Sequence, residues 1–228
     1  MQQRARTVGR YQRKKSYGLP LWGALSVVVL IAGLGFAAST FLLSDAPGYD
    51  DWLVGEETHT RGSSSAPVSV VFFGDFQCVE CATFAREIQP LLQADFIGDK
   101  VVRLAYRHVP TIGRDSGRAA EASECAADQG KFWEYQELVY RWQGAPNSER
   151  LSHELLRQLG LGIRLDPSDF RTCMQHGFTA GQVMDDLRFA ETLGVSEAPA
   201  LYVNSVRIDD PTDYGQLRLH IIGAAVAQ

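Results

Sequence analysis

Two cysteines separated by two residues are the part of this chain best suited to chemistry. Cys78 and Cys81 follow an apolar run over 68–73 and begin a segment with helical periodicity. A thiol at a helix N-terminus faces unpaired backbone N–H groups and the positive end of the helix dipole, which stabilise its thiolate. We therefore predict a dithiol redox centre in which Cys78 is the more exposed nucleophile and Cys81 is the resolving thiol.

Other interpretations of this cysteine pair remain open. It can form a static disulfide, or it can supply half of a zinc site, because paired cysteines also bind zinc. Redox chemistry is favoured because a CxxC pair on a helix after a strand is a usual layout of redox-active thiols. Glu80 would raise the pKa of the Cys78 thiol if its carboxylate points inward, and it would be screened if it points to solvent.

The elements around the cysteines are read from hydrophobic periodicity. The run over 68–73 is almost continuously apolar, which suits a strand covered on both faces. The following helix buries one face, and we expect the chain to turn near Pro90. A second strand, over 101–107, completes a βαβ unit.

The rest of the chain is predicted to be mostly helical before it returns to strands. Residues 201–203 and 206–208 form a hairpin with a turn at 204–205, and a helix covers 214–226. The helical segments that precede this hairpin are 119–129, 132–142, 148–159, 167–175 and 180–193.

Four local patterns stand in series along the chain. They are Gly74-Asp75-Phe76-Gln77-Cys78-x-x-Cys81, Cys125-Ala126-x-x-Gln129-Gly130-Lys131-Phe132-Trp133, Phe170-x-x-Cys173 and Leu193-Gly194-Val195-x-x-x-Pro199-x-x-Tyr202-Val203-Asn204. In order and spacing they resemble the DsbA-like members of the thioredoxin superfamily, over nearly all of the chain from Ser65 onward. The resemblance implies an α/β thioredoxin fold over 67–228, with an all-helical insertion at about 114–193 between the second and third strands.

Pro199 is a site residue by this resemblance. A proline just before a strand cannot donate a ladder hydrogen bond, and we predict a cis peptide bond between Ala198 and Pro199. In the family a cis-proline loop faces the active-site disulfide, and the residue before the proline supplies backbone groups to the substrate. Family members more often carry threonine or valine where this chain has Ala198, which leaves its substrate preference open.

Two further features depart from the family. The pair between the cysteines is Val79-Glu80 instead of a proline-led pair, and Phe72 occupies the position that often holds a buried acid. Asp75 is the nearest replacement for that acid in proton transfer. Capping the turn before the helix is an equally good role for it.

Cys125 and Cys173 are the remaining cysteines. The N-terminal segment, discussed below, predicts that this part of the chain lies in an oxidising compartment outside the cytoplasm. Two leftover cysteines there pair more often than they stay free, and we predict a structural disulfide between them. Some relatives of the family carry such a second bond. The competing interpretation joins these two to Cys78 and Cys81 in a four-cysteine zinc site, although they lack the short ligand spacing of zinc motifs.

The N-terminal part of the chain predicts a membrane anchor. The net charge of −5 hides six cations before Ser16, and without them the remainder has 16 basic and 27 acidic residues. We predict a basic cytoplasmic tail over 1–18, one transmembrane helix over 19–43 and a linker over 44–66, with the rest of the chain outside the cytoplasm. The alternative is a cleaved signal peptide, because 37–39 offers small residues to a peptidase.

Together these features predict a membrane-tethered, extracytoplasmic thiol-disulfide oxidoreductase that oxidises cysteine pairs of exported proteins. The exchange needs no cofactor, but an unidentified redox partner must reoxidise the site. The same fold working as a reductase or isomerase is one alternative, and a non-enzymatic exported binding scaffold is another. The five histidines lack metal-ligand spacing and no nucleic-acid motif stands out, so neither a metal site nor a nucleic-acid partner is predicted.

Overall fold

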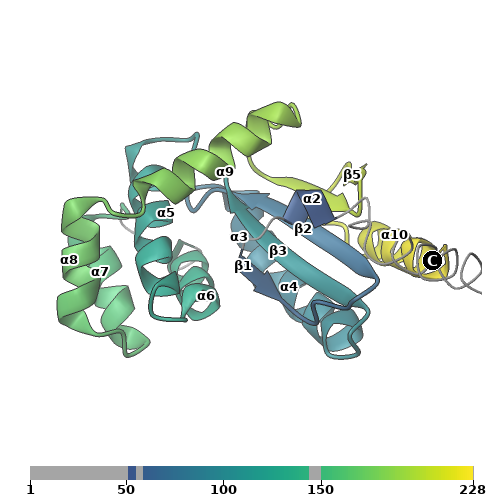
Figure 1. Cartoon of the computed structure of the whole chain (residues 1–228), viewed down its shortest axis with the longest axis horizontal. Helices are drawn as coiled ribbons and strands as arrows, with labels where there is room; N and C mark the ends of the chain where they lie inside the picture. The colour runs from purple at the N-terminus through teal and green to yellow at the C-terminus, as the bar shows by residue number, and fades with distance from the viewer. Residues whose placement is uncertain (1–50, 55–58, 144–149, 228) are drawn as a thin grey trace, which may run out of the picture. The chain divides into compact units, whose positions relative to one another are not determined.

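A five-stranded mixed sheet forms the centre of the molecule (Figure 1). The computed structural model describes residues 51–54, 59–143 and 150–227. The strand order across the sheet is β1-β3-β2-β4-β5. The strands are β1 (His59–Arg61), β2 (Val68–Gly74), β3 (Val102–His108), β4 (Ala200–Val203) and β5 (Val206–Ile208).

The pairing of the strands confirms the predicted βαβ unit and hairpin. β2 and β3 are parallel, and β2 pairs with β4 in the antiparallel sense. β5 is antiparallel to β4, as the predicted hairpin requires. β1 lies antiparallel on the outer side of β3 and was not predicted.

Both faces of the sheet are covered by helices, which explains why all seven residues of β2 are buried. Val70 and Phe72 belong to a core that also contains Phe84, from the helix after the cysteines, and Leu217 of α10 (Tyr214–Val226). Val71 and Phe73 belong to a second core on the other face. That core includes residues of α2 (Asp51–Val54) and α9 (Ala180–Thr192).

The helix after the cysteines continues through Pro90, and the predicted turn there is wrong. It consists of consecutive segments, namely α3 (Val79–Thr83), η1 (Phe84–Ile88), α4 (Gln89–Leu92) and η2 (Gln93–Ile97). The π-helical turn η1 ends with the Gln89 N–H bonded to the Phe84 carbonyl, five residues earlier. This wider turn admits the proline, which has no N–H and crowds the carbonyl before it in a regular α-helix.

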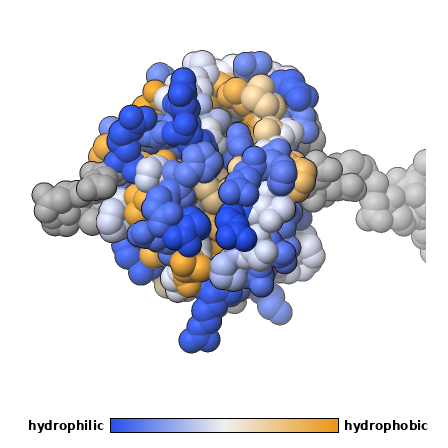
Figure 2. Space-filling model, turned by 90° about the vertical axis from the view of Figure 1, so that its left-hand side faces the viewer, coloured by the Kyte–Doolittle hydropathy of each residue, from blue (hydrophilic) through white to orange (hydrophobic). Residues whose placement is uncertain are grey.

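The insertion between strands β3 and β4, which flank the central strand β2, is all-helical. In Figure 1, four of its helices gather at one end of the sheet while α10 lies at the other. Figure 2 shows that the surface at the insertion end is mostly hydrophilic, with scattered hydrophobic side chains. The four helices are α5 (Arg114–Ala127), α6 (Phe132–Gln143), α7 (His153–Gly162) and α8 (Pro167–His176), and α9 completes the insertion.

The segment expected to be a linker, 44–66, contains part of the folded domain. It includes α2 and β1, and the register pairs His59 with Tyr106. Two contacts hold these elements: Arg107 donates to the Val54 carbonyl at 2.9 Å, and the Trp133 indole donates to the Thr60 carbonyl at 3.2 Å. A three-residue edge strand carries too little periodicity to be recognised in a sequence.

The predicted tail over 1–18 and transmembrane helix over 19–43 lie outside the described residues. Within the described ranges, no helix combines the length and apolarity that crossing a bilayer requires.

Candidate active site

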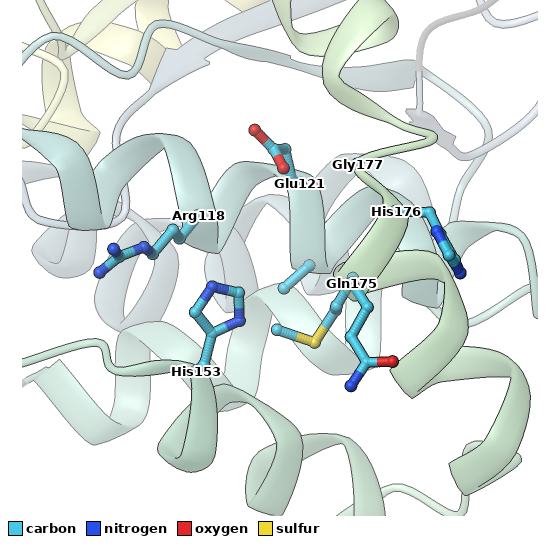
Figure 3. Close-up of a pocket in the computed structure, with 8 residues that line it drawn as sticks. Arg118, Glu121, His153, Gln175, His176 and Gly177 are labelled. Atoms are coloured by element: carbon cyan, nitrogen blue, oxygen red, sulfur yellow. The ribbon is translucent and has the colours of Figure 1, made fainter.

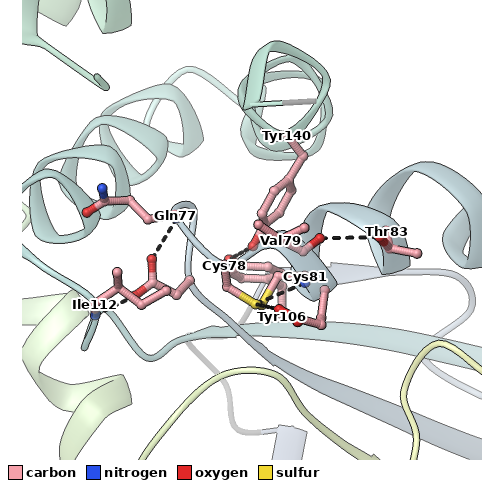
Figure 4. The surroundings of a disulfide bond; sticks show 10 residues. Gln77, Cys78, Val79, Cys81, Thr83, Tyr106, Ile112 and Tyr140 are labelled. Carbon is pink, nitrogen blue, oxygen red and sulfur yellow. Dashed lines mark hydrogen bonds between the residues drawn. A yellow bond between two sulfur atoms is a disulfide. The ribbon is translucent and has the colours of Figure 1, made fainter. Parts of the chain in front are cut away.

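Cys78 and Cys81 form a disulfide at the start of α3 (Figure 4). Cys78 is the N-cap residue, with extended backbone angles (φ −77°, ψ 126°). Its sulfur accepts a hydrogen bond from the backbone N–H of Cys81 at 3.0 Å. Both residues are buried, and Cys78 is 3% exposed against 0% for Cys81. The N-terminal backbone of α3 is therefore placed to stabilise a thiolate on Cys78 after reduction.

Glu80 lies close to the same sulfur. Its Oε2 atom is 3.9 Å from Cys78 Sγ, although the residue as a whole is exposed. Of the two orientations left open by the sequence, the carboxylate adopts one that brings it near the thiol. A negative charge at this distance disfavours a thiolate, so Glu80 opposes the effect of the Cys81 N–H.

The loop before Cys78 is fixed by side chains that accept backbone hydrogen bonds. Buried Asp75 accepts from the Gln77 N–H at 2.7 Å and from the Ile112 N–H at 3.0 Å. The Gln77 side-chain oxygen in turn accepts from Ser116, through its backbone N–H and its hydroxyl, each at 2.9 Å. Asp75 thus caps the turn before the helix, which is the second of its two predicted roles. Both of its carboxyl oxygens accept from backbone N–H groups.

The position that often holds a buried acid is filled by an aromatic stack. The Phe72 and Phe84 rings lie 4.0 Å apart between centroids. Figure 4 shows Tyr106 and Tyr140 beside the disulfide, and their hydroxyls are hydrogen-bonded at 2.8 Å. Burial raises the pKa of both phenols, so they stay neutral and accept no proton during exchange.

The Ala198–Pro199 peptide bond is cis, as predicted. Ala200, the first residue of β4, pairs with Phe73 of β2. The Pro199 loop therefore lies at the end of the sheet where β2 leads into the cysteine loop. The register brings together two segments more than a hundred residues apart in sequence.

Cys125 on α5 and Cys173 on α8 form the second disulfide, which spans 48 residues of sequence. Both residues are buried in the core of the insertion. Because all four cysteines are paired in two disulfides, the structure contradicts the four-cysteine zinc site. The described chain leaves no cysteine free.

One group of polar side chains has no signal in the sequence. His59, His108 and Glu124 meet through their side chains, although they come from β1, β3 and α5. The five histidines lack metal-ligand spacing in the sequence, yet the fold brings two of them, His59 and His108, to one carboxyl group. Only the pairing of β1 with β3, which local spacing does not reveal, brings them together.

A hollow in the insertion lies apart from the cysteine pair. Figure 3 shows Arg118 and Glu121 of α5, His153 of α7 and His176 at the end of α8 around it. The lining contains no cysteine, and its polar groups are held by the insertion alone. Thiol exchange therefore belongs to the site at the start of α3.

Comparisons with known proteins agree with this geometry. The family model described as Thioredoxin matches residues 55–221. Disulfide bond formation protein D of Bacillus subtilis is 30% identical over 160 residues, which are 69% of this chain and 72% of that protein. Probable disulfide bond formation protein D of Bacillus anthracis is 33% identical over 147 residues, which are 63% of this chain and 68% of that protein.

A solved structure is also similar to this chain. The crystal structure of oxidised BdbD from Bacillus subtilis matches with a TM-score of 0.70 and 28% sequence identity, and the match covers 74% of this chain and 93% of that one. These similarities support an enzyme and disfavour the non-enzymatic scaffold.

Proposed function

Because the chain belongs to the thioredoxin family and is a DsbA-like thiol-disulfide oxidoreductase, we propose that it donates its Cys78–Cys81 disulfide to cysteine pairs of exported proteins. The relatives named as disulfide bond formation proteins support this direction. The observation that carries the proposal is the hydrogen bond from the Cys81 N–H to Cys78 Sγ at 3.0 Å. A donor aimed at this sulfur stabilises the reduced site, and a stabilised reduced form makes a disulfide more oxidising.

The exchange proceeds in two displacements. A substrate thiolate attacks Cys78 Sγ, a mixed disulfide forms, and the Cys78–Cys81 bond breaks with its electron pair leaving on Cys81, which takes a proton from water. A second substrate thiolate then attacks the substrate sulfur of the mixed disulfide and releases Cys78 as a thiolate. The substrate has lost two electrons as its own disulfide forms, and the Cys78–Cys81 pair has gained them.

Apolar side chains beside the site support a protein substrate. Val79, which directly follows Cys78, is 66% exposed, and Ile112, whose N–H donates to Asp75 in the loop before Cys78, is 55% exposed. Exposed apolar side chains next to a reactive group provide a contact for an unfolded polypeptide. The backbone of Ala198, before the cis proline, is the further contact that the family resemblance suggests.

The membrane tether is part of the proposal. The six N-terminal cations and the uncharged run over 19–43 support a cytoplasmic N-terminus and a catalytic domain outside the cytoplasm. A second, buried disulfide between Cys125 and Cys173 suits an oxidising compartment. Each turnover leaves two thiols, so a redox partner in that compartment must reoxidise the site.

One observation favours the alternative, a reductase or isomerase. The Glu80 carboxylate near Cys78 Sγ destabilises the thiolate, which stabilises the disulfide and makes it less oxidising.

A single-turnover reaction distinguishes the two directions. Oxidised full-length protein in detergent is mixed without oxygen with one equivalent of a reduced peptide that has two cysteines, and the peptide mass is followed. The proposal predicts that most of the peptide becomes oxidised, whereas Cys78→Ser protein leaves it reduced. If the peptide stays reduced with the wild-type protein, and the reduced protein instead opens the oxidised peptide, the oxidising direction is refuted.

A further inference from the structure

Two histidines and a glutamate converge at the side of the sheet that carries β1. His59 lies on the edge strand β1, His108 is the last residue of β3, and Glu124 lies on α5. The Nε2 atoms of His59 and His108 are 2.7 and 2.8 Å from the same oxygen, Oε1 of Glu124. All three ligand atoms lie within 4.8 Å of one another.

This cluster is largely shielded from solvent but is not sealed. The side chains of His108 and Glu124 are 1% and 7% exposed, whereas that of His59 is 19% exposed. The His59 ring stacks on Phe132 with 3.7 Å between centroids, which fixes the direction of its Nε2 atom. The site therefore has preorganised donors and one partly open side through which an ion could enter.

Glu124 directs one side-chain oxygen at both histidines. Its Oε1 atom lies within hydrogen-bond distance of the Nε2 atoms of His59 and His108, and its side chain is only 7% exposed. A buried carboxyl oxygen that faces two imidazole nitrogens offers the donor set of a metal site.

The two distances from a histidine Nε2 atom to Glu124 Oε1 are close to those that a bound cation requires. Nitrogen and oxygen ligands lie about 2.0 to 2.2 Å from Zn²⁺, which places neighbouring ligand atoms of a tetrahedral site roughly 3.3 Å apart. The Nε2 and Oε1 atoms are hydrogen-bonded at 2.7 and 2.8 Å. If each histidine Nε2 atom moved about half an ångström away from Glu124 Oε1, a cation could take the place of the hydrogen-bonded protons between them.

We propose that His59, His108 and Glu124 bind one divalent cation of the Zn²⁺ class, with the remaining coordination position left to water. Two imidazole nitrogens and one carboxylate suit zinc and its neighbours, whereas calcium and magnesium take oxygen ligands. The ion would join β1, β3 and α5. It would also support the chain that leads from His108 to Ile112, whose N–H bonds Asp75 before the reactive cysteines.

Zinc titration of the fully oxidised, full-length protein in detergent tests this site. Both disulfides must be intact, because free thiols at Cys78 and Cys81 would themselves bind zinc. Calorimetry is expected to show one equivalent of zinc bound, and saturating zinc is expected to raise the Tm by about 5 °C. His59→Phe keeps a ring against Phe132 and removes one ligand, and Glu124→Gln keeps the shape and removes the charge. Each is expected to weaken zinc binding at least 10-fold.

The control is His220→Phe, because His220 is exposed and stands outside the cluster. It is expected to bind zinc as the wild type does, and circular dichroism at the start of each titration shows that every variant is folded. The proposal is overturned if the wild type shows no saturable zinc binding, or if folded His59→Phe and Glu124→Gln proteins bind zinc unchanged. Saturable binding of calcium without zinc would refute the assigned class of cation. None of these outcomes depends on the direction of thiol exchange.

Discussion

Cys78 is subject to two opposing electrostatic influences. The Cys81 N–H, 3.0 Å from its sulfur, stabilises the thiolate, and the Glu80 carboxylate, 3.9 Å away, destabilises it. The backbone donor is held by the start of α3, whereas Glu80 is exposed and partly screened by solvent. We therefore expect the backbone donor to dominate and Glu80 to moderate it.

Replacing Glu80 with glutamine should make the Cys78 thiol more acidic. Two unit charges about 4 Å apart in a water-like dielectric repel by about 1 kcal/mol, which corresponds to roughly 0.7 of a pKa unit and about 20 mV in reduction potential. The pKa is measured from the ultraviolet absorbance of the thiolate. Glu87→Gln makes the same charge change at another exposed position of this helix. An equal shift in both variants would rule out a specific effect of Glu80.

The features of the site that could be predicted from the sequence are those that a short stretch of residues reveals. The cysteine spacing, the proline before a strand and the two remaining cysteines are each visible in a short stretch of residues. The orientation of Glu80 depends on its side-chain conformation, and the two roles of Asp75 differ only in what its oxygens contact. His59 and His108 meet Glu124 across 65 and 16 residues of sequence, so no local spacing points to their cluster.

At the scale of elements, the insertion is held together by the Cys125–Cys173 disulfide between α5 and α8. Replacing both cysteines with serine opens a closed loop of 48 residues. In the chain-entropy model this costs about 4 kcal/mol, which corresponds to a fall of roughly 10 °C in Tm. Peptide oxidation at Cys78 should persist below the new Tm, since the reactive pair lies outside the insertion. Free thiols at both positions in the wild-type protein, detected by non-reducing mass spectrometry, would contradict the assignment.

Asp115, in the first turn of α5, should make the stability of the insertion depend on pH. Its buried carboxylate accepts from Arg150 at 2.8 Å and from Arg118 at 3.0 Å, and the Arg150 hydrogen bond contributes most to lowering its pKa below 3.8. A carboxyl whose pKa is lowered on folding stabilises the fold above its unfolded pKa. That stability is lost as the pH falls through the folded pKa.

Asp115→Asn should therefore lower the free energy of unfolding near neutral pH, and the deficit should shrink below about pH 4. Urea unfolding of the wild type and the variant at a series of pH values measures this difference in the free energy of unfolding. Asp185→Asn is the control, because Asp185 forms an exposed ion pair with Arg188 and such pairs contribute little. A deficit that stays constant over the whole pH range would show that the Asp115 ion pairs are not its cause.

The sequence predicts long periodic elements better than short or irregular ones. The insertion helices and the hairpin of β4 and β5 appear close to their expected positions, because each has repeated apolar residues. β1 is three residues long and is recognised only through its pairing with β3. Pro90 predicts a turn, but the π-helical segment before it lets the helix continue to Ile97.

At the scale of the whole molecule, the sheet brings the two halves of the exchange site together. The pairing of Phe73 with Ala200 sets the cis-proline loop beside the loop that carries the cysteines. The anchor proposed over 19–43 would hold this site at a membrane surface, within reach of chains emerging from the cytoplasm. Such a position suits a protein that supplies disulfides to newly exported proteins.

The reduction potential of the Cys78–Cys81 pair tests the central claim most directly. Full-length protein in detergent is equilibrated with glutathione buffers, and the reduced fraction is measured by mass after alkylation. The Cys81 N–H at the Cys78 sulfur predicts a potential nearer about −120 mV, the value of the strong oxidant DsbA. A potential nearer about −270 mV, the value of thioredoxin, would mark a reductase and contradict the proposed direction.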